Sequence, residues 1–94
     1  MKTPKQLAEE RLIIADQYAK LGERKVQLKR LRAKHYDDYR EDYTSDAGVK
    51  RAWERTEEGL ELMEIKEKMK SKDHKMSALF TMIKVMESEA RNQY

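Results

Sequence analysis

The clearest pattern in the sequence is an apolar residue at every third or fourth position over the last third of the chain. Between residues 62 and 90 only Lys72 interrupts this spacing, and no Gly or Pro follows Leu60. Such spacing places the side chains along one side of an α-helix, as in a coiled coil. We predict a long helix over about residues 47–92 whose apolar seam needs a partner helix. The seam consists of Leu62, Ile65, Met69, Met76, Leu79, Ile83 and Met86, with Ala90 at its end.

The first third of the chain has the same helical periodicity. Thr3 followed by Pro4 is typical of a helix start, because threonine caps the free N–H groups and proline has none to leave unpaired. We predict a first helix over about residues 3–39. One apolar stripe recurs every seven residues, at Leu7, Ile14, Leu21 and Leu28, and a neighbouring stripe of mostly small residues contains Ala8, Leu12, Ala15, Ala19, Gly22, Val26 and Ala33.

A single turn-like segment separates the two helices, and Ser45 or Asp46 within it can cap the second one. We therefore predict one all-α domain over residues 1–94, a long antiparallel hairpin of two helices with coiled-coil character and a turn at about residues 43–47. The second helix is expected to be continuous, although Gly59 and the polar residues 71–74 are its weak points, and a kink or a split into two helices is possible near 71–74. Because two helices leave much of their broad apolar faces uncovered, we expect self-association through the seam.

The composition agrees with this architecture. Charged residues make up 41% of the chain against 38% hydrophobic, but the apolar positions are periodic, unlike those of a disordered chain. The absence of cysteine excludes disulfides and thiolate metal sites. No apolar run approaches the roughly 20 residues that a membrane span needs, and the first residues do not resemble a signal peptide. We expect a soluble cytoplasmic protein with no membrane partner.

Positive charge is concentrated in the first helix. Residues 1–36 contain ten Lys/Arg and four Asp/Glu, a balance of +6, whereas residues 37–94 contain eleven and fourteen, a balance of −3. Like charges this close repel one another, so they favour an anionic partner, either the acidic second helix or an external polyanion. The cluster consists of Lys20, Arg24, Lys25, Lys29, Arg30, Arg32 and Lys34, opposed only by Glu23.

Aromatic residues flank the turn beside this basic cluster. Three tyrosines, of which Tyr43 is the last, come before the turn, and a tryptophan follows it. Phosphate neutralisation combined with stacking of unpaired bases is how proteins bind single strands without sequence preference. The pattern favours single-stranded DNA as partner. The predicted contact residues are the seven cations with Tyr36, Tyr39, Lys50, Arg51 and Trp53.

An internal role for the same residues is the first alternative. In a hairpin that turns near residue 45, residue 30 lies opposite about residue 60. The cations then face a glutamate-rich segment of the second helix, and the aromatic residues can form the packed apex of the hairpin. The glutamates concerned are Glu57, Glu58, Glu61 and Glu64.

A protein-only interaction module, such as a phage adaptor, scaffold or host-defence inhibitor, is the second alternative. Five methionines lie between residues 63 and 86, and methionine-rich faces adapt to different partners. An enzyme is a more distant third. The two histidines, His35 and His74, stand in no metal-binding motif, and no nucleophile has a nearby base. We therefore predict no catalytic residue, no metal and no cofactor.

The order of these features resembles a known family. The segment Lys25-Val26-Gln27-Leu28-Lys29, the basic run after it, the tyrosines, the polar turn and the acidic second helix are similar to small phage recombination-mediator proteins of the UvsY type, over about residues 21–93. The resemblance implies a ring-forming helical homo-oligomer in a bacterial host that binds single-stranded DNA and helps a recombinase displace a single-strand-binding protein. It assigns Lys25, Lys29, Arg30, Arg32, Lys34 and Tyr36 to the DNA-binding segment. The acidic residues 37–42 depart from the family pattern.

Overall fold

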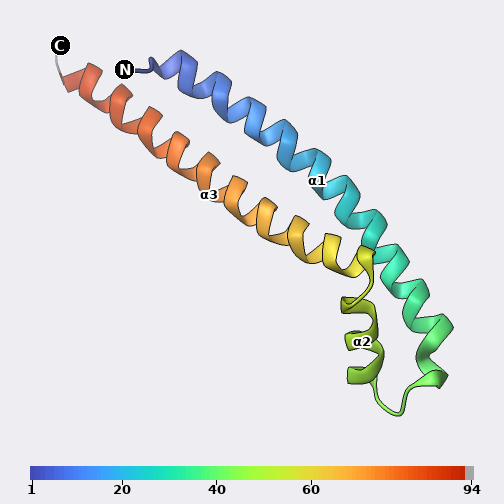
Figure 1. Cartoon of the computed structure of the whole chain (residues 1–94). Coiled ribbons are helices and arrows are strands. Elements are labelled where there is room, and N and C mark those ends of the chain that lie inside the picture. The colour runs from blue at the N-terminus through green and yellow to red at the C-terminus, as the bar shows by residue number, and fades with distance from the viewer. Residues whose placement is uncertain (93–94) are drawn as a thin grey trace.

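The computed structural model describes residues 1–92, and all regular structure within them is helical, as predicted. Helix α1 spans Pro4–Tyr39 and is followed by a short 3-10 helix, Arg40–Asp42; α2 spans Asp46–Glu54 and α3 spans Glu57–Asn92. Helices α1 and α3 run antiparallel and side by side, with the turn at one end (Figure 1). The molecule is a rod of 70 × 19 × 17 Å.

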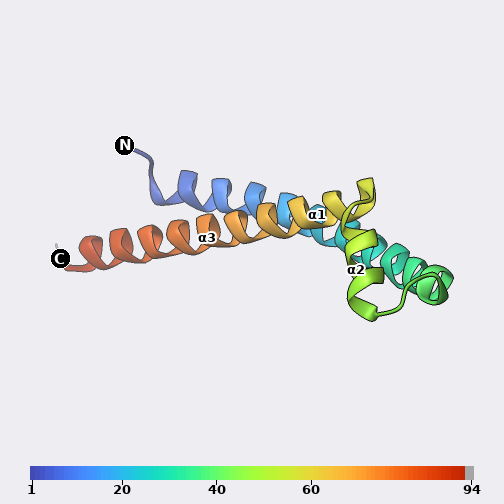
Figure 2. The same ribbon diagram turned by 60° about the horizontal axis from the view of Figure 1, so that its bottom comes forward.

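The second half of the chain forms two helices instead of the single continuous helix that was predicted. The break lies at Arg55–Thr56, whereas residues 71–74, the predicted place for a kink, are helical within α3. In two views α2 is turned away from the axis of α3 (Figures 1 and 2). The described residues therefore contain three α-helices, and the predicted two-helix hairpin is wrong in this respect.

Thr56 and Gly59 explain where the break lies. The Thr56 hydroxyl donates to the Trp53 carbonyl oxygen at 2.6 Å and accepts from the Gly59 N–H at 3.0 Å, so one side chain both ends α2 and caps α3. Gly59 lies against the end of α2, where a Cβ atom would overlap the Trp53 carbonyl oxygen and lie 2.9 Å from its carbonyl carbon. The close approach requires glycine at this position.

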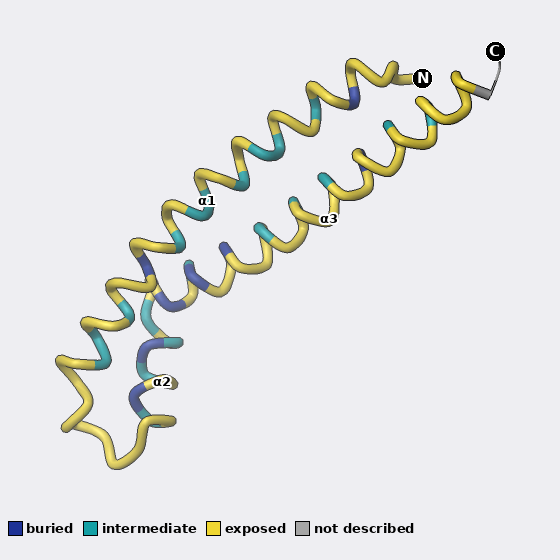
Figure 3. Tube along the Cα trace, turned by 180° about the vertical axis from the view of Figure 1, so that it is seen from behind, coloured by how far each residue is buried: buried dark blue, intermediate teal, exposed yellow. Residues whose placement is uncertain are grey.

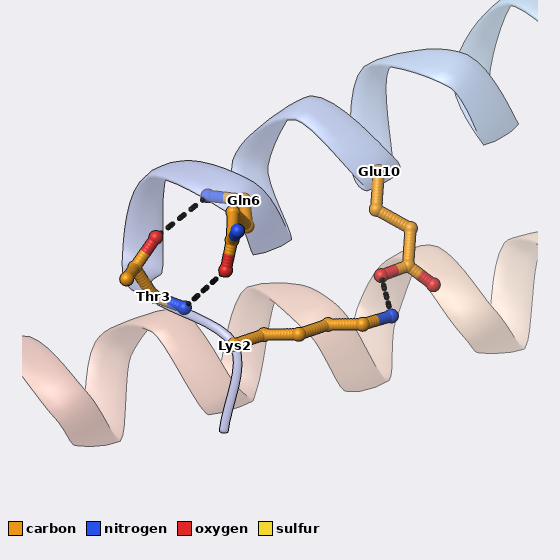
Figure 4. A network of polar contacts seen from close by, with 4 residues as sticks. All are labelled: Lys2, Thr3, Gln6 and Glu10. Atoms are coloured by element: carbon orange, nitrogen blue, oxygen red, sulfur yellow. Dashed lines mark hydrogen bonds and ion pairs between the residues drawn. The ribbon is translucent and has the colours of Figure 1, made fainter.

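Helix α1 begins as predicted, at a capping box (Figure 4). The Thr3 hydroxyl accepts from the Gln6 N–H at 3.2 Å, and the Gln6 side-chain oxygen accepts from the Thr3 N–H at 2.9 Å. Lys2, just before the helix, forms an ion pair with Glu10 at 2.6 Å. The two hydrogen bonds of the capping box satisfy backbone N–H groups that the first turn would otherwise leave free.

The apolar seam of α3 packs against α1 of the same chain (Figure 3). The seam was predicted as the interface of an oligomer, and in the structure its residues pack within one chain, some of them only in part. On α1, Leu7 and Leu28 are buried, and Ile14 and Leu21 are partly buried. On α3, Leu62, Ile65 and Leu79 are buried, and Met69, Met76, Ile83 and Met86 are partly buried.

The three helices share one core near the turn. Leu28 of α1, Trp53 of α2, and Leu62 and Ile65 of α3 form a single buried cluster. Away from this junction, only α1 and α3 contact each other, and the second stripe of α1 is largely exposed; Leu12 retains 69% of its surface. The largest cluster of buried side chains therefore lies where α1, α2 and α3 meet.

Candidate nucleic-acid interface

Helices α1 and α3 meet close to the register predicted for the hairpin. The Arg24 guanidinium donates two hydrogen bonds to Glu61, from Nε to Oε2 at 2.6 Å and from Nη2 to Oε1 at 2.8 Å. Farther along, Lys72 donates to the Gln17 side-chain oxygen at 2.9 Å. The Arg24 hydrogen bonds and charge lower the pKa of Glu61. This pair is the one contact, among the described residues, between the predicted basic cluster and the glutamates opposite it.

Most of the predicted basic cluster has no acidic partner. Besides Arg24, only Lys20 of this cluster forms an ion pair within residues 1–92, with Asp16 at 3.2 Å. The register brings the cations of α1 level with the glutamates of α3, but most of these side chains lie on helix faces that do not meet. Glu61 and Glu58 raise the pKa of Arg24 on one flank of the α1–α3 contact. The remaining cations, Lys25, Lys29, Arg30, Arg32 and Lys34, form no ion pair in the described structure.

Five cations from all three helices gather beside the shared core, and we call them the junction cluster. Burial lowers the pKa of Lys66, and the positive charges of the other four members lower it further. No carboxylate is among the groups that shift this pKa. The cluster consists of Lys25, Lys29 and Arg32 of α1, Lys50 of α2 and Lys66 of α3.

The core fixes the position of these charges. Lys25, Lys29 and Arg32 precede or follow the fully buried Leu28 by one to four residues, and Lys25 and Arg32 are themselves half-buried. Lys66 directly follows the buried Ile65, which belongs to the same core as Leu28. The aliphatic stems of the half-buried Lys25 and Arg32 therefore lie along the apolar contact, while their charged groups reach its edge.

Lys66 is the site residue that the sequence analysis missed. Two signals pointed to it: it directly follows a seam residue, and the predicted register places residue 66 opposite about residue 24. The charge balance of −3 over residues 37–94 describes the second half of the chain as a whole and does not distinguish one flank of a helix from the other. The flank that carries Lys66 faces Lys25 and Arg32, and the flank that carries Glu61 faces Arg24.

The aromatic residues divide between the core and the surface. Trp53 was predicted to stack on bases, but it is 5% exposed and packs with Leu28, so we remove it from the site. Tyr36 packs partly against the same core. Tyr39 is exposed, and the centroid of its ring lies 4.7 Å from the centroid of the His35 ring. The packed-apex alternative therefore holds for Trp53 and in part for Tyr36.

The other predicted contacts lie around the junction cluster. Arg30 and Lys34 are exposed on α1 and are not among the groups that act on Lys66. Arg51 is exposed on α2, directly after Lys50, and lines a separate hollow with Tyr43 and Arg55. The structure thus brings together four of the predicted residues, Lys25, Lys29, Arg32 and Lys50, and adds Lys66.

Two further features are absent from the described part of the chain. No three His, Cys, Asp or Glu side chains there are placed to hold a metal ion. None of the helices of residues 1–92 has both the length and the apolar character needed to cross a membrane. Comparisons of the chain with protein-family models, curated protein sequences and solved structures gave no match.

Proposed function

We propose that this protein binds single-stranded nucleic acid without catalysing a reaction, and that the phosphates of the strand contact the junction cluster. The observation that carries the proposal is that five cations from three helices converge beside the shared core and that none of them forms an ion pair within residues 1–92. A polyanion reduces their mutual repulsion and releases counterions of its own on binding. The resemblance to phage recombination mediators is compatible with this proposal, because those proteins bind single-stranded DNA.

Salt sensitivity and a charge-reversal variant test the site. With about five phosphate contacts, affinity for a single strand should fall about 100-fold between about 50 and 200 mM salt. Lys29→Glu with Lys66→Glu should reduce affinity at least about tenfold at the lower salt, because two contacts become repulsive. Fluorescence anisotropy of a labelled oligothymidine measures both effects, and circular dichroism checks the helix content of the variant.

The matched control is Lys5→Glu with Lys75→Glu, which changes the net charge equally at exposed positions outside the junction cluster. If affinity depends on the cluster, the control should bind nearly as well as the wild type. Equal losses in the two variants would mean that only net charge attracts the strand. Unchanged binding by the cluster variant would overturn the proposed site.

We also propose that the rods self-associate through an apolar surface at the open end of the hairpin, where the seam ends. At the end of the rod away from the turn, an apolar hollow of about 490 Å³ lies between the start of α1 and the end of α3. Its walls include Leu7, Met82, Val85 and Met86, and half the surface of Met82 and of Val85 is exposed. Exposed apolar surface of this kind favours contact with a second copy, since one chain of this length has a small core.

A further inference from the structure

We infer that the hollow beside α2 is a subsite for one unpaired base, which stacks on Tyr43 while its neighbouring phosphate lies between Arg51 and Arg55. The inference rests on the proposed function and specifies which form of nucleic acid the site accepts. The hollow has a volume of about 450 Å³. It is lined by Tyr43, Gly48, Arg51, Ala52 and Arg55, with no carboxylate among them.

The shape of the hollow comes from two small residues. Gly48 and Ala52 lie one turn apart on α2 and form a floor without bulky side chains. Tyr43 packs directly over this floor, since a Cβ atom on Gly48 would lie 3.4 Å from both Cβ and Cδ1 of Tyr43. The Ser45 hydroxyl accepts from the Gly48 N–H at 3.2 Å and so holds the start of α2 beside the tyrosine.

Tyr43 is positioned to stack because its ring is held and still accessible. It retains 42% of its surface, in contrast to Trp53 in the core. Stacking on an aromatic ring is open to every base, so it gives affinity without sequence preference. A base within a duplex is already paired and stacked between its neighbours. The subsite therefore favours a single strand.

The two arginines supply the phosphate contact. Val49 and Trp53 are buried, and residues two positions farther on lie about 200° around the helix, so Arg51 and Arg55 project from the opposite, exposed side of α2. Arg55 follows the last residue of α2 but keeps helical backbone angles, with φ −89° and ψ −10°. Neither arginine forms an ion pair within residues 1–92. Paired guanidinium groups bind phosphate oxygens through several parallel hydrogen bonds.

The subsite adjoins the junction cluster. Lys50 of the cluster and Arg51 of the subsite are consecutive residues, whose Cα atoms are about 3.8 Å apart. A strand that lies on Lys66, Arg32 and Lys50 therefore reaches the hollow by passing around α2. The phosphates at the junction cluster and the base on Tyr43 belong to adjoining parts of one strand.

Abasic DNA separates the stacking contact from the phosphate contact. We compare an oligothymidine of about 12 nucleotides with an abasic strand of equal length at about 50 mM salt. The wild type should bind the oligothymidine about five to one hundred times more tightly, since one stacked base contributes an effect of this size. Tyr43→Leu should bring the ratio close to one, because leucine keeps apolar bulk but has no ring. Its affinity for the abasic strand should stay near that of the wild type.

A variant of the two arginines tests the phosphate contact of the subsite. Arg51→Gln with Arg55→Gln should lower the affinity for both strands by the same factor and make that affinity less dependent on salt. A base preference that survives in Tyr43→Leu, or that is lost instead in Tyr39→Leu, would overturn the subsite. Equal binding of both strands by the wild type would overturn it too, while leaving the phosphate contacts of the proposed function intact. Absence of binding to either strand would overturn both proposals.

Discussion

At the scale of single residues, the helical glycines Gly22 and Gly59 have different surroundings and should respond oppositely to the same substitution. A Cβ at Gly22 would meet only the Met69 methyl group, at an ordinary 3.7 Å. Gly22→Ala should therefore raise the free energy of unfolding by about 1 kcal/mol, the gain in helix propensity. Gly59→Ala should lower it, by about 2 kcal/mol or more, because the Trp53 carbonyl group occupies the space. Urea unfolding measures both, and a gain at Gly59 would contradict the described break.

At the scale of helices, the positive charges of the junction cluster repel one another and so destabilise the packing of the three helices. Burial lowers the pKa of Lys66, and so do Arg32, Lys29, Lys25 and Lys50. A base whose pKa is lower in the folded protein loses its proton more readily there than in the unfolded chain. Stability therefore rises with pH as Lys66 titrates, until the ordinary value of 10.5 is passed.

Removal of this charge should stabilise the protein at neutral pH. We expect Lys66→Gln to raise the free energy of unfolding at pH 7, by less than about 1 kcal/mol, since exposed charges are screened. The gain should shrink toward pH 10, where Lys66 itself begins to lose its charge. Urea unfolding at low salt measures it at both pH values, with Lys70→Gln as the control outside the cluster. A stability gain of Lys66→Gln that grows with pH would contradict the lowered pKa of Lys66.

Periodicity and capping residues were sufficient to predict the helical class and the start of α1 at Thr3, because these features depend on local sequence. The break at Thr56 was missed, although threonine is a favoured N-cap residue and acidic residues such as Glu57 and Glu58 are typical of a first helical turn. Its significance depends on a tertiary contact, the approach of Gly59 to Trp53. Which flank of α3 carries Lys66 likewise depends on how the two long helices are rotated about their axes, and apolar spacing indicates this only coarsely.

At the scale of the whole molecule, the long shape leaves apolar surface exposed, which the proposed self-association would cover. The radius of gyration is 20.1 Å, whereas a compact domain of this length would have about 12 Å. Met82→Glu with Val85→Glu should reduce the molar mass measured by light scattering, because it places charges in the apolar hollow. Leu60→Glu, at an exposed position outside that hollow, is the control. An unaltered mass in the first variant would exclude this surface as the contact.

The antiparallel course of α1 and α3 places residues 1 and 92 at one end of the rod and α2 at the other (Figure 1). A fluorophore, a fused domain or a solid support attached near either terminus is therefore held away from α2 along the 70 Å axis. Two copies joined through those ends would form a bivalent molecule whose α2 helices point in opposite directions. If the proposed site binds a single strand, such a fusion bridges two separate strands, while a short oligonucleotide reaches only one site at a time and gains no avidity.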